Sequence, residues 1–235
     1  MSVLSPAPPS PVRVPRVRPS YPLCMARKTE MSAAPFVPES HDLQRLKAAV
    51  EHCRGCPLYE NATQAVFGEG PDWAEVVFLG EKPGDKEDRS GKPFVGPAGR
   101  LLDKSLVSAG IPRERAYVTN AVKHFKWEPQ GGRRLHKKPT EREIAACRPW
   151  LRAEMAILQP KVLVCLGASA AISAFGRHVR LTDLRGTFSS TELSEATFVT
   201  VHPSALLRIP DPDERHHEID RFVADLRRVA EKLDY

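Results

Sequence analysis

Four short, mostly apolar runs, separated by longer stretches with helical spacing, constrain what this chain can fold into. Each run is no longer than five residues, which is strand length. Strands that are apolar without strict alternation are buried on both faces, as in a parallel sheet covered by helices on each side. The sequence therefore predicts a three-layer α/β/α fold with a central four-stranded parallel sheet, formed by residues 76–79, 117–119, 162–166 and 197–201.

Helical spacing of apolar residues predicts four helices around this sheet, and a further helix of small residues is expected after residue 166. The four helices cover residues 43–50, 98–109, 141–158 and 214–233. Gly110 is expected to end the second helix, and Thr140 with Glu143 forms a capping box at the start of the third. Pro149 lies inside the third helix and predicts a kink or a split, because proline removes a backbone hydrogen bond.

The first 38 residues differ in composition from the rest of the chain. Six of the 22 prolines fall within the first twenty residues, and apolar periodicity is almost absent. Such a segment buries too little surface to offset its ordering entropy, so we expect residues 1–38 to be disordered. The arginines and scarce acids of this segment are typical of a transit peptide, but its prolines exclude the amphipathic helix that a transit peptide forms. Another possibility is that translation begins later, at Met25 or Met31. Residues 39–235 form one domain, which begins near a possible helix cap at Ser40.

Polar clusters follow the four predicted strands. Residues 80–85 follow the first strand, Asn120 the second, Gly167 the third and residues 202–204 the fourth. In open parallel sheets, ligand sites lie at the carboxyl ends of the strands. The sequence therefore predicts that these clusters meet in one site.

Positive charge is concentrated in two segments rather than spread over the chain. The net charge is +6, with +4 in residues 1–38 and +5 in residues 120–139, so the remainder carries about −3. Residues 131–139 read as a basic loop that contains one histidine, His136. One interpretation is a solvated loop, and the other is a face that binds a polyanion with a residue able to act as base, ligand or nucleophile.

The five cysteines indicate a metal centre. Cys53 and Cys56 have the spacing with which two thiolates bind one metal, Cys147 and Cys165 lie 18 residues apart, and Cys24 falls in the predicted tail. Zinc and a [4Fe–4S] cluster both accept four thiolates, and no export signal supports disulfides. Zinc would leave the protein colourless, whereas an iron–sulfur protein is brown.

Several motifs, taken in order, resemble those of a known family. Residues 80–99, the cysteine spacing, the strand that ends at Asn120 and the motif at residues 202–204 are similar to those of the iron–sulfur uracil-DNA glycosylases of family 4. The segment at residues 131–139 resembles the arginine- and histidine-bearing loop of the UdgX subgroup, whose members become covalently joined to uracil-containing DNA. The resemblance covers residues 40–233 and implies a uracil-DNA glycosylase fold with a [4Fe–4S] cluster on Cys53, Cys56, Cys147 and Cys165.

The resemblance implies roles for the residues that match these motifs. Uracil must leave the base stack to reach a protein site. Phe94 would stack on the flipped base and Asn120 would read its polar edge, while Glu81 stabilises the sugar cation and His202 donates to the leaving uracil. In the UdgX subgroup a loop histidine attacks C1′ in place of water, and His136 occupies that position. The remaining expected uracil or DNA contacts are Lys82, Gly84, Asp85, Asp88, Lys123, Arg133, Arg134 and Arg208.

The chain also departs from the UdgX pattern. Lys82 stands where that pattern has glutamine, and Leu135 stands where it usually has isoleucine. Two alternatives stay open, namely a hydrolytic family 4 glycosylase that releases free abasic DNA, and a non-catalytic iron–sulfur protein that binds nucleic acid. We expect a cytoplasmic monomer that acts on single-stranded and possibly double-stranded uracil-containing DNA, without a membrane partner.

Overall fold

The central sheet confirms the predicted α/β class and has one strand more than the sequence predicts. The computed structural model describes Met1 and residues 31–234. Its five-stranded sheet has the order β2-β1-β5-β7-β6. The strands are β1 (Val76–Gly80), β2 (Ala116–Asn120), β5 (Val162–Leu166), β6 (Phe188–Ser189) and β7 (Thr197–Thr200). Strands β2, β1, β5 and β7 are parallel to one another, and β6 is antiparallel to β7. The four predicted parallel strands are confirmed, and the additional strand β6, at two residues, is too short to produce a sequence pattern.

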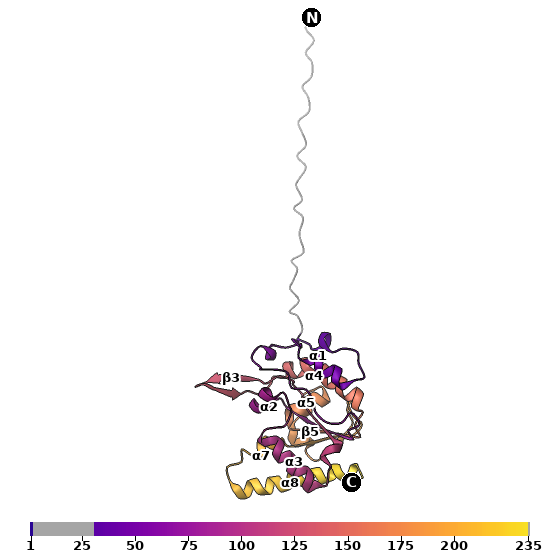
Figure 1. Ribbon diagram of the computed structural model, residues 1–235, viewed down its shortest axis with the longest axis vertical. Coiled ribbons are helices and arrows are strands. Elements are labelled where there is room, and N and C mark those ends of the chain that lie inside the picture. Colours follow the sequence, from indigo (N-terminus) through magenta and orange to yellow (C-terminus); the bar gives the residue numbers. More distant parts are fainter. Residues whose placement is uncertain (2–30, 235) are drawn as a thin grey trace. The chain divides into compact units, whose positions relative to one another are not determined.

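Helices cover both faces of this sheet and form the three predicted layers (Figure 1). One face packs against α1 (Leu43–Val50), α4 (Glu141–Leu158) and α5 (Ala168–Phe175), and the other packs against α3 (Pro97–Ala109) and α8 (Pro212–Lys232). Alternate residues of one strand enter the two cores: Val77 and Leu79 belong to the first, and Val76 and Phe78 to the second. Burial on both faces explains why the strands lack polar alternation.

Most predicted helix ends are confirmed, with two differences. Gly110 ends α3 at φ 76°, and the Thr140 Oγ1 and Glu143 carboxylate form the capping box of α4. Pro149 does not split α4, which is a single helix of 18 residues. Buried neighbours such as Trp150 hold this helix against the sheet and compensate for the missing hydrogen bond. The cap of α1 is Asp42 rather than Ser40.

The compact unit begins before the predicted boundary at residue 39. It spans Met31–Tyr235, and it includes a short 3-10 helix, η1 (Ala34–Phe36). Ala33 is 1% exposed, and its backbone N–H donates to the Ala146 carbonyl at 2.7 Å. Residues 31–38 therefore belong with the domain, while the disorder predicted for residues 2–30 lies outside the described residues.

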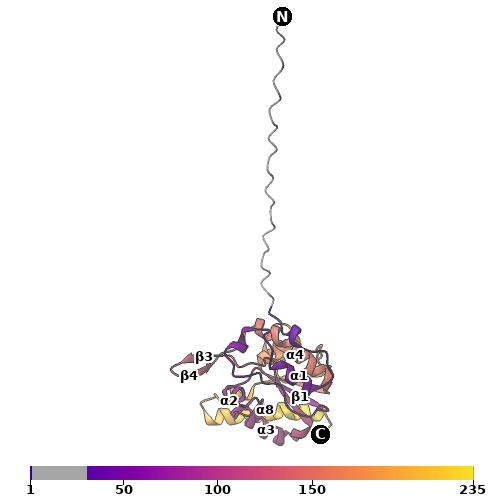
Figure 2. The ribbon, with the colours of Figure 1, turned by 45° about the horizontal axis from the view of Figure 1, so that its top comes forward.

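The basic segment after β2 is a β-hairpin rather than a loop. Strands β3 (Trp127–Gln130) and β4 (Arg133–His136) pair antiparallel and project from the body of the domain (Figures 1 and 2). Gly131 and Gly132 connect them with φ values of 54° and 76°. Two residues with positive φ form the tight turn that suits the twist of a hairpin.

Short helices complete the fold between the longer elements. These are η2 (Pro57–Glu60), α2 (Asp85–Ser90), η3 (Arg113–Arg115), α6 (Leu181–Leu184) and α7 (Pro203–Leu206). Within residues 31–234, no helix has both the length and the apolar character needed to cross a bilayer.

Candidate active site

A cavity of about 920 Å³ opens at the carboxyl ends of the strands, where the sequence places its polar clusters. It brings together most of the predicted site residues, namely Glu81, Lys82, Gly84, Asp85, Phe94, Asn120, His136, His202 and Arg208. Four other predicted residues, Asp88, Lys123, Arg133 and Arg134, do not line it. The edge of the sheet thus gathers residues that lie as far as 127 positions apart in the sequence.

Asn120 and Phe94 meet over a glycine. Asn120 ends β2 directly beside Gly80, which ends β1. A Cβ atom on Gly80 would collide with Asn120 Oδ1 and with the Phe94 ring. Glycine at this position therefore leaves the side-chain amide and the aromatic ring next to each other in the cavity.

Phe94 is held in an unusual backbone conformation. Its φ is 57°, which is uncommon for a residue with a side chain and costs conformational energy. Gly99 makes this possible, because a Cβ there would collide with the Phe94 carbonyl. The Phe94 ring stacks toward the His202 imidazole, with centroids 6.3 Å apart and planes 28° apart. This aromatic pair forms one wall of the cavity.

His202 is a neutral hydrogen-bond donor toward the cavity. It caps α7, where its Nδ1 accepts from the Ser204 backbone N–H at 3.1 Å. Since a backbone N–H can only donate, Nδ1 carries no proton, and the proton of the neutral ring resides on Nε2. Burial, followed by the charges of Arg208 and Lys82, lowers the pKa of His202 to about 4. At neutral pH the ring is therefore uncharged with Nε2–H free to donate.

Glu81 is oriented by a residue that the sequence did not single out. Its Oε2 accepts from the Ser169 hydroxyl at 2.6 Å. Ser169 lies on α5, just after Gly167 at the end of β5, and is 2% exposed. Its position beside a strand-end glycine is the signal that could have identified it. This contact holds one carboxylate oxygen, and among the described residues Oε1 accepts no hydrogen bond, while Glu81 lines the cavity.

The Gly84 turn is held by Glu87, which the sequence also missed. Its carboxylate accepts from the backbone N–H of Gly84 at 3.1 Å and of Gly96 at 2.7 Å. These two bonds tie the segment after β1 to the segment that carries Phe94. The spacing of Gly84 and Glu87, three residues apart at a helix start, is the signal for this contact.

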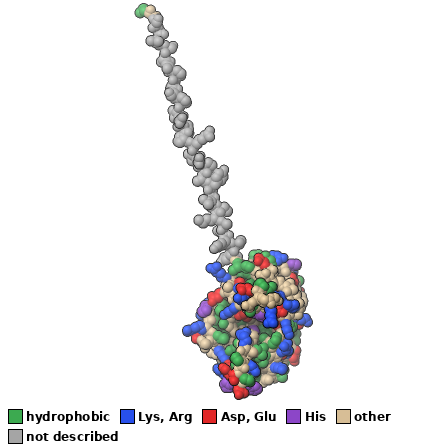
Figure 3. Space-filling model, turned by 90° about the vertical axis from the view of Figure 1, so that its left-hand side faces the viewer, with side chains coloured by type: hydrophobic (Ala, Val, Ile, Leu, Met, Phe, Trp, Pro, Cys, Tyr) green, Lys and Arg blue, Asp and Glu red, His purple; other side chains and the backbone are tan. Residues whose placement is uncertain are grey.

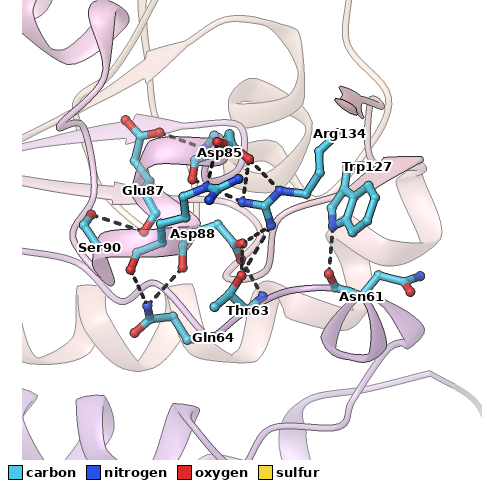
Figure 4. A network of polar contacts seen from close by, with 11 residues as sticks. Asn61, Thr63, Gln64, Asp85, Glu87, Asp88, Ser90, Trp127 and Arg134 are labelled. Atoms are coloured by element: carbon cyan, nitrogen blue, oxygen red, sulfur yellow. Dashed lines mark hydrogen bonds and ion pairs between the residues drawn. The ribbon is translucent and has the colours of Figure 1, made fainter. Parts of the chain in front are cut away.

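Arg134 docks the hairpin onto α2 (Figure 4). Its guanidinium contacts Asp85 at 2.5 Å and Asp88 at 2.6 Å, and its side chain is 16% exposed. Asp88 also accepts from the Thr63 backbone and hydroxyl at 2.9 and 2.6 Å. The guanidinium lies over the rings of Phe125 and Trp127 as well. Two carboxylates thus contact this guanidinium in the absence of DNA, and the expected contact of Arg134 with DNA stays a prediction.

His136 lies at the cavity end of the docked hairpin. It is the last residue of β4, and its ring packs edge-on against Phe125 with centroids 4.7 Å apart. It approaches Gly84, where an added Cβ would lie 3.5 Å from its Cε1. Burial, and next the charge of Lys82, lowers the pKa of His136 below its usual value. The imidazole is therefore neutral, with a lone pair, over a wider pH range than an ordinary histidine.

Lys123 does not face DNA, contrary to the sequence prediction. Its side chain is completely buried, and Nζ contacts Glu154 at 2.5 Å, Thr119 Oγ1 at 2.7 Å and the Asn120 carbonyl at 3.0 Å. Glu154 also accepts from the Tyr117 and Thr119 hydroxyls. The partner is Glu154, on the apolar face of α4. The residues next to Lys123 in the sequence give no sign of this distant partner. This buried polar cluster supports the end of β2 from beneath.

The exposed cations surround the site without forming a uniform patch. Arg133 and Lys138 are exposed, and Lys137 pairs with Glu128 at 2.8 Å. Figure 3 views the side from which the hairpin projects and shows Lys and Arg side chains spread among acidic and apolar ones. Among the described residues Arg133 and Lys138 form no ion pair, so both remain available to an anionic ligand.

Three of the four predicted cysteine ligands lie near one another on the α4 side of the sheet. Burial raises the pKa of the Cys147 thiol to about 12, and Cys56 and Cys53 add to the rise. Cys147 Sγ accepts from the Lys123 backbone N–H at 3.3 Å, and Cys53 Sγ accepts from the Trp150 indole at 3.2 Å. Burial alone raises the pKa of Cys165, without an effect from another cysteine. Among the described residues, no group of three or more His, Cys, Asp or Glu side chains is arranged to hold a metal ion.

Comparison with known proteins agrees with this geometry. A family model described as the uracil DNA glycosylase superfamily matches residues 67–227. A type-4 uracil-DNA glycosylase of Thermotoga maritima is 41% identical over 178 residues, covering 75% of this chain and 86% of that protein. Type-4 enzymes of Sulfurisphaera tokodaii and Pyrobaculum aerophilum are each 36% identical, covering 72% of this chain and 77% and 86% of theirs. This chain belongs to the uracil DNA glycosylase superfamily, on its type-4 branch.

Proposed function

We propose that this protein excises uracil from DNA and that the reaction ends in a covalent bond to the abasic sugar. The observation that carries the first part is the meeting of Phe94, Asn120 and His202 in one cavity. The names of its type-4 relatives support the same activity. Two alternatives, hydrolytic release of abasic DNA and binding without excision, are outcomes of the experiments below.

The cavity has the groups that uracil excision requires. The flipped base stacks on Phe94, and the Asn120 amide pairs with the carbonyl and imide edge. As the glycosidic bond breaks, its electron pair passes to uracil, and His202 Nε2–H donates to the uracil oxygen that gains charge. Glu81 faces the sugar cation with the carboxylate oxygen that Ser169 leaves free. Groups fixed before the reaction stabilise developing charge without having to reorganise.

His136 is the proposed nucleophile toward the sugar. Its nitrogen lone pair forms a bond with C1′, which is electron-deficient after uracil has left. The imidazole N–H proton then passes to water. Its neutral state, its contact with the cavity at Gly84 and its position on a docked hairpin support this assignment. Uracil leaves as the second product, and the DNA stays attached to the protein.

Denaturing electrophoresis tests the covalent step. The protein is incubated with uracil-containing single-stranded DNA, boiled in detergent and run on a gel, and a slower band is expected. His136→Ser should lose this band and release free abasic DNA, because water then reaches C1′. A cross-link that persists in His136→Ser would contradict the assignment. Free abasic DNA from the unaltered protein would indicate simple hydrolysis, and binding without uracil release would indicate a non-catalytic protein.

A [4Fe–4S] cluster is the proposed resident cofactor. The donor chemistry fits, since Cys53, Cys56 and Cys147 are buried thiols and two of them accept N–H bonds of the kind that tune cluster sulfurs. Cys165 is the fourth ligand expected from the sequence. His124 is the alternative that the experiment below tests, because it is 5% exposed and follows Lys123, whose amide contacts Cys147. When bound, the cluster would tie α1 and α4 to the segment after β2.

Iron and sulfide analysis of purified variants distinguishes the two arrangements. Cys147→Ala should lose the brown colour and most of the iron. If His124 is the fourth ligand, His124→Ala should lose cluster stability while Cys165→Ala retains the colour. The reverse result would support four cysteines, and a colourless protein that contains zinc would contradict the cluster.

A further inference from the structure

Lys82 brings a primary amine to the cavity at the carboxyl ends of the strands. Among the described residues, its Nζ has neither a hydrogen bond nor an ion pair, and it lies 5.0 Å from the centroid of the Phe125 ring. The same ring contacts His136, with centroids 4.7 Å apart. The amine and the imidazole therefore lie against one aromatic side chain, and both line the cavity.

The surroundings of Lys82 differ from those of a phosphate-binding lysine. Lys82 is half-buried, and the charged groups nearest to it include the carboxylates of Glu81 and Glu87. Burial lowers its pKa despite these two acids, which oppose the shift. A lysine in such a place gains nucleophilic character, because a larger fraction of the amine lacks its proton.

The product of uracil excision carries a group with which such an amine reacts. An abasic deoxyribose interconverts between a closed ring and an open chain, and the open chain has an aldehyde at C1′. That carbon is the one that His136 is proposed to attack, so a cavity that admits it to His136 also brings it to the neighbourhood of Lys82. Water or the imidazole attacks C1′ while the deoxyribose ring is closed. An amine attacks C1′ after the ring has opened to the aldehyde.

We propose that Lys82 forms an imine with the C1′ aldehyde of abasic DNA, which gives this protein a second covalent activity toward abasic sites that already exist. The inference rests on the proposed function only for the claim that this cavity accepts the sugar of a damaged nucleotide. It needs neither uracil nor His136.

The step is balanced without any additional reagent. The Nζ lone pair forms a bond with C1′, and the carbonyl π electrons pass to oxygen. Nζ then loses its protons as the oxygen leaves as water, and a C1′=N bond results. Addition of water reverses the sequence and restores the amine and the aldehyde. The bond is therefore reversible, in contrast to the proposed His136 adduct.

Borohydride trapping on preformed abasic DNA tests this activity. The full-length protein is mixed with an oligonucleotide that already contains an abasic site, and sodium borohydride is added to reduce the imine to a stable amine. A slower band is expected with borohydride and is expected to be absent without it. An oligonucleotide with a tetrahydrofuran abasic analogue, which has no aldehyde, should give no band. Mass spectrometry should place the adduct on the peptide that contains Lys82.

Variants of the cavity lysines identify the nucleophile. Lys82→Arg keeps the positive charge but cannot form a stable imine, and it should reduce trapping at least tenfold. Lys86→Arg is the matched control, because Lys86 is exposed and lines the same cavity, and this variant should trap like the unaltered protein. Equal trapping by Lys82→Arg, or an adduct mapped to another residue, would overturn the inference.

The two proposals fail in distinguishable ways. Loss of uracil release from uracil-containing DNA would contradict the proposed function. Absence of borohydride-dependent trapping on preformed abasic DNA, in a preparation that still releases uracil, would contradict the imine alone.

Discussion

Two lysines close to the same strand ends show how differently one side chain can be used in this fold. Lys123 lies beneath the end of β2, fully buried, and pairs with Glu154. Lys82 lies above the end of β1, in the open cavity, against the Phe125 ring and without an ion pair among the described residues. The buried polar cluster of Tyr117, Thr119, Lys123 and Glu154 is closed to solvent, whereas the cavity exposes its charged groups to a ligand.

The difference shows that the partner, rather than the residue type, decides whether a cation stabilises the fold or remains available for chemistry. Lys123 has polar oxygen atoms around it, and these compensate for its desolvation. Lys82 is surrounded by acids that attract it without contacting it. We therefore expect changes in the buried polar cluster to alter stability, and changes in the cavity to alter reactivity.

The largest expected effect comes from breaking the buried pair. Glu154→Leu leaves Lys123 charged and unpaired in a dry site, which should lower the free energy of unfolding by about 3–5 kcal/mol. Urea denaturation followed by circular dichroism measures the change. The double variant Lys123→Met/Glu154→Leu removes both charges and should recover much of the loss. A double variant as unstable as the single one would show that the unpaired charge is not the cause.

The next effect concerns the docking of the hairpin. Arg134→Gln removes the contacts with Asp85 and Asp88 that hold β4 against α2. Misplacement of a nucleophile by about 1 Å can reduce a rate roughly 100-fold, so covalent adduct formation should slow by about 10- to 100-fold. Uracil release should change less, because the uracil-facing residues lie outside the hairpin. Arg133→Gln, measured at saturating DNA, is the matched control, since Arg133 is exposed and one residue away.

A smaller effect is expected in the pH dependence of the adduct. Neutral imidazole is the attacking form, so the rate should stay flat at neutral pH and fall as the pH drops below the lowered pKa of His136. Lys82→Gln removes a charge that lowers this pKa, although burial is the larger cause. The fall should then begin at a higher pH. Single-turnover gels between about pH 4 and about pH 8, a range that includes the ordinary histidine pKa, measure the midpoint. An unchanged midpoint would show that the charge of Lys82 does not influence the pKa of His136.

The smallest effect concerns DNA attraction by the exposed cations. Arg133→Gln should reduce the salt dependence of binding to uracil-free single-stranded DNA by about 0.7 in the slope of log K against log salt. Arg134→Gln should leave the slope nearly unchanged, because two carboxylates already neutralise that guanidinium. Fluorescence anisotropy at several salt concentrations provides both slopes. An equal loss of slope in both variants would mean that Arg134 breaks its contacts with Asp85 and Asp88 and binds DNA.

The predictable parts of this fold depend on short-range patterns. The strands at residues 76–79 and 162–166 and the helix end at Gly110 follow from hydrophobic runs and from a residue that tolerates positive φ. The same patterns placed Asn120 and His202 at strand ends, and the edge of a parallel sheet then brought them together. The two-residue strand β6 had no such pattern and was missed.

The hairpin shows where local patterns were available but were interpreted incorrectly. Gly131 and Gly132 are the signal of a tight turn, yet the basic residues around them lack the apolar alternation that usually identifies strands. The strands form because aromatic residues and Arg134 hold them from one side. Charge alone therefore predicted a ligand-binding loop where the structure has a docked hairpin.

The sequence by itself determined the layer architecture, the location of the site at the strand ends and the family. These depend on periodicity and on motifs that are continuous in the chain. Only the tertiary structure decided the state of each charged residue. The partners of Lys123 and Arg134 lie 31 and 49 residues away in the sequence, and Lys82 has acids nearby without contact. The energy of a charge depends on its burial and on the distance to its partner, and both are set only when distant segments pack together.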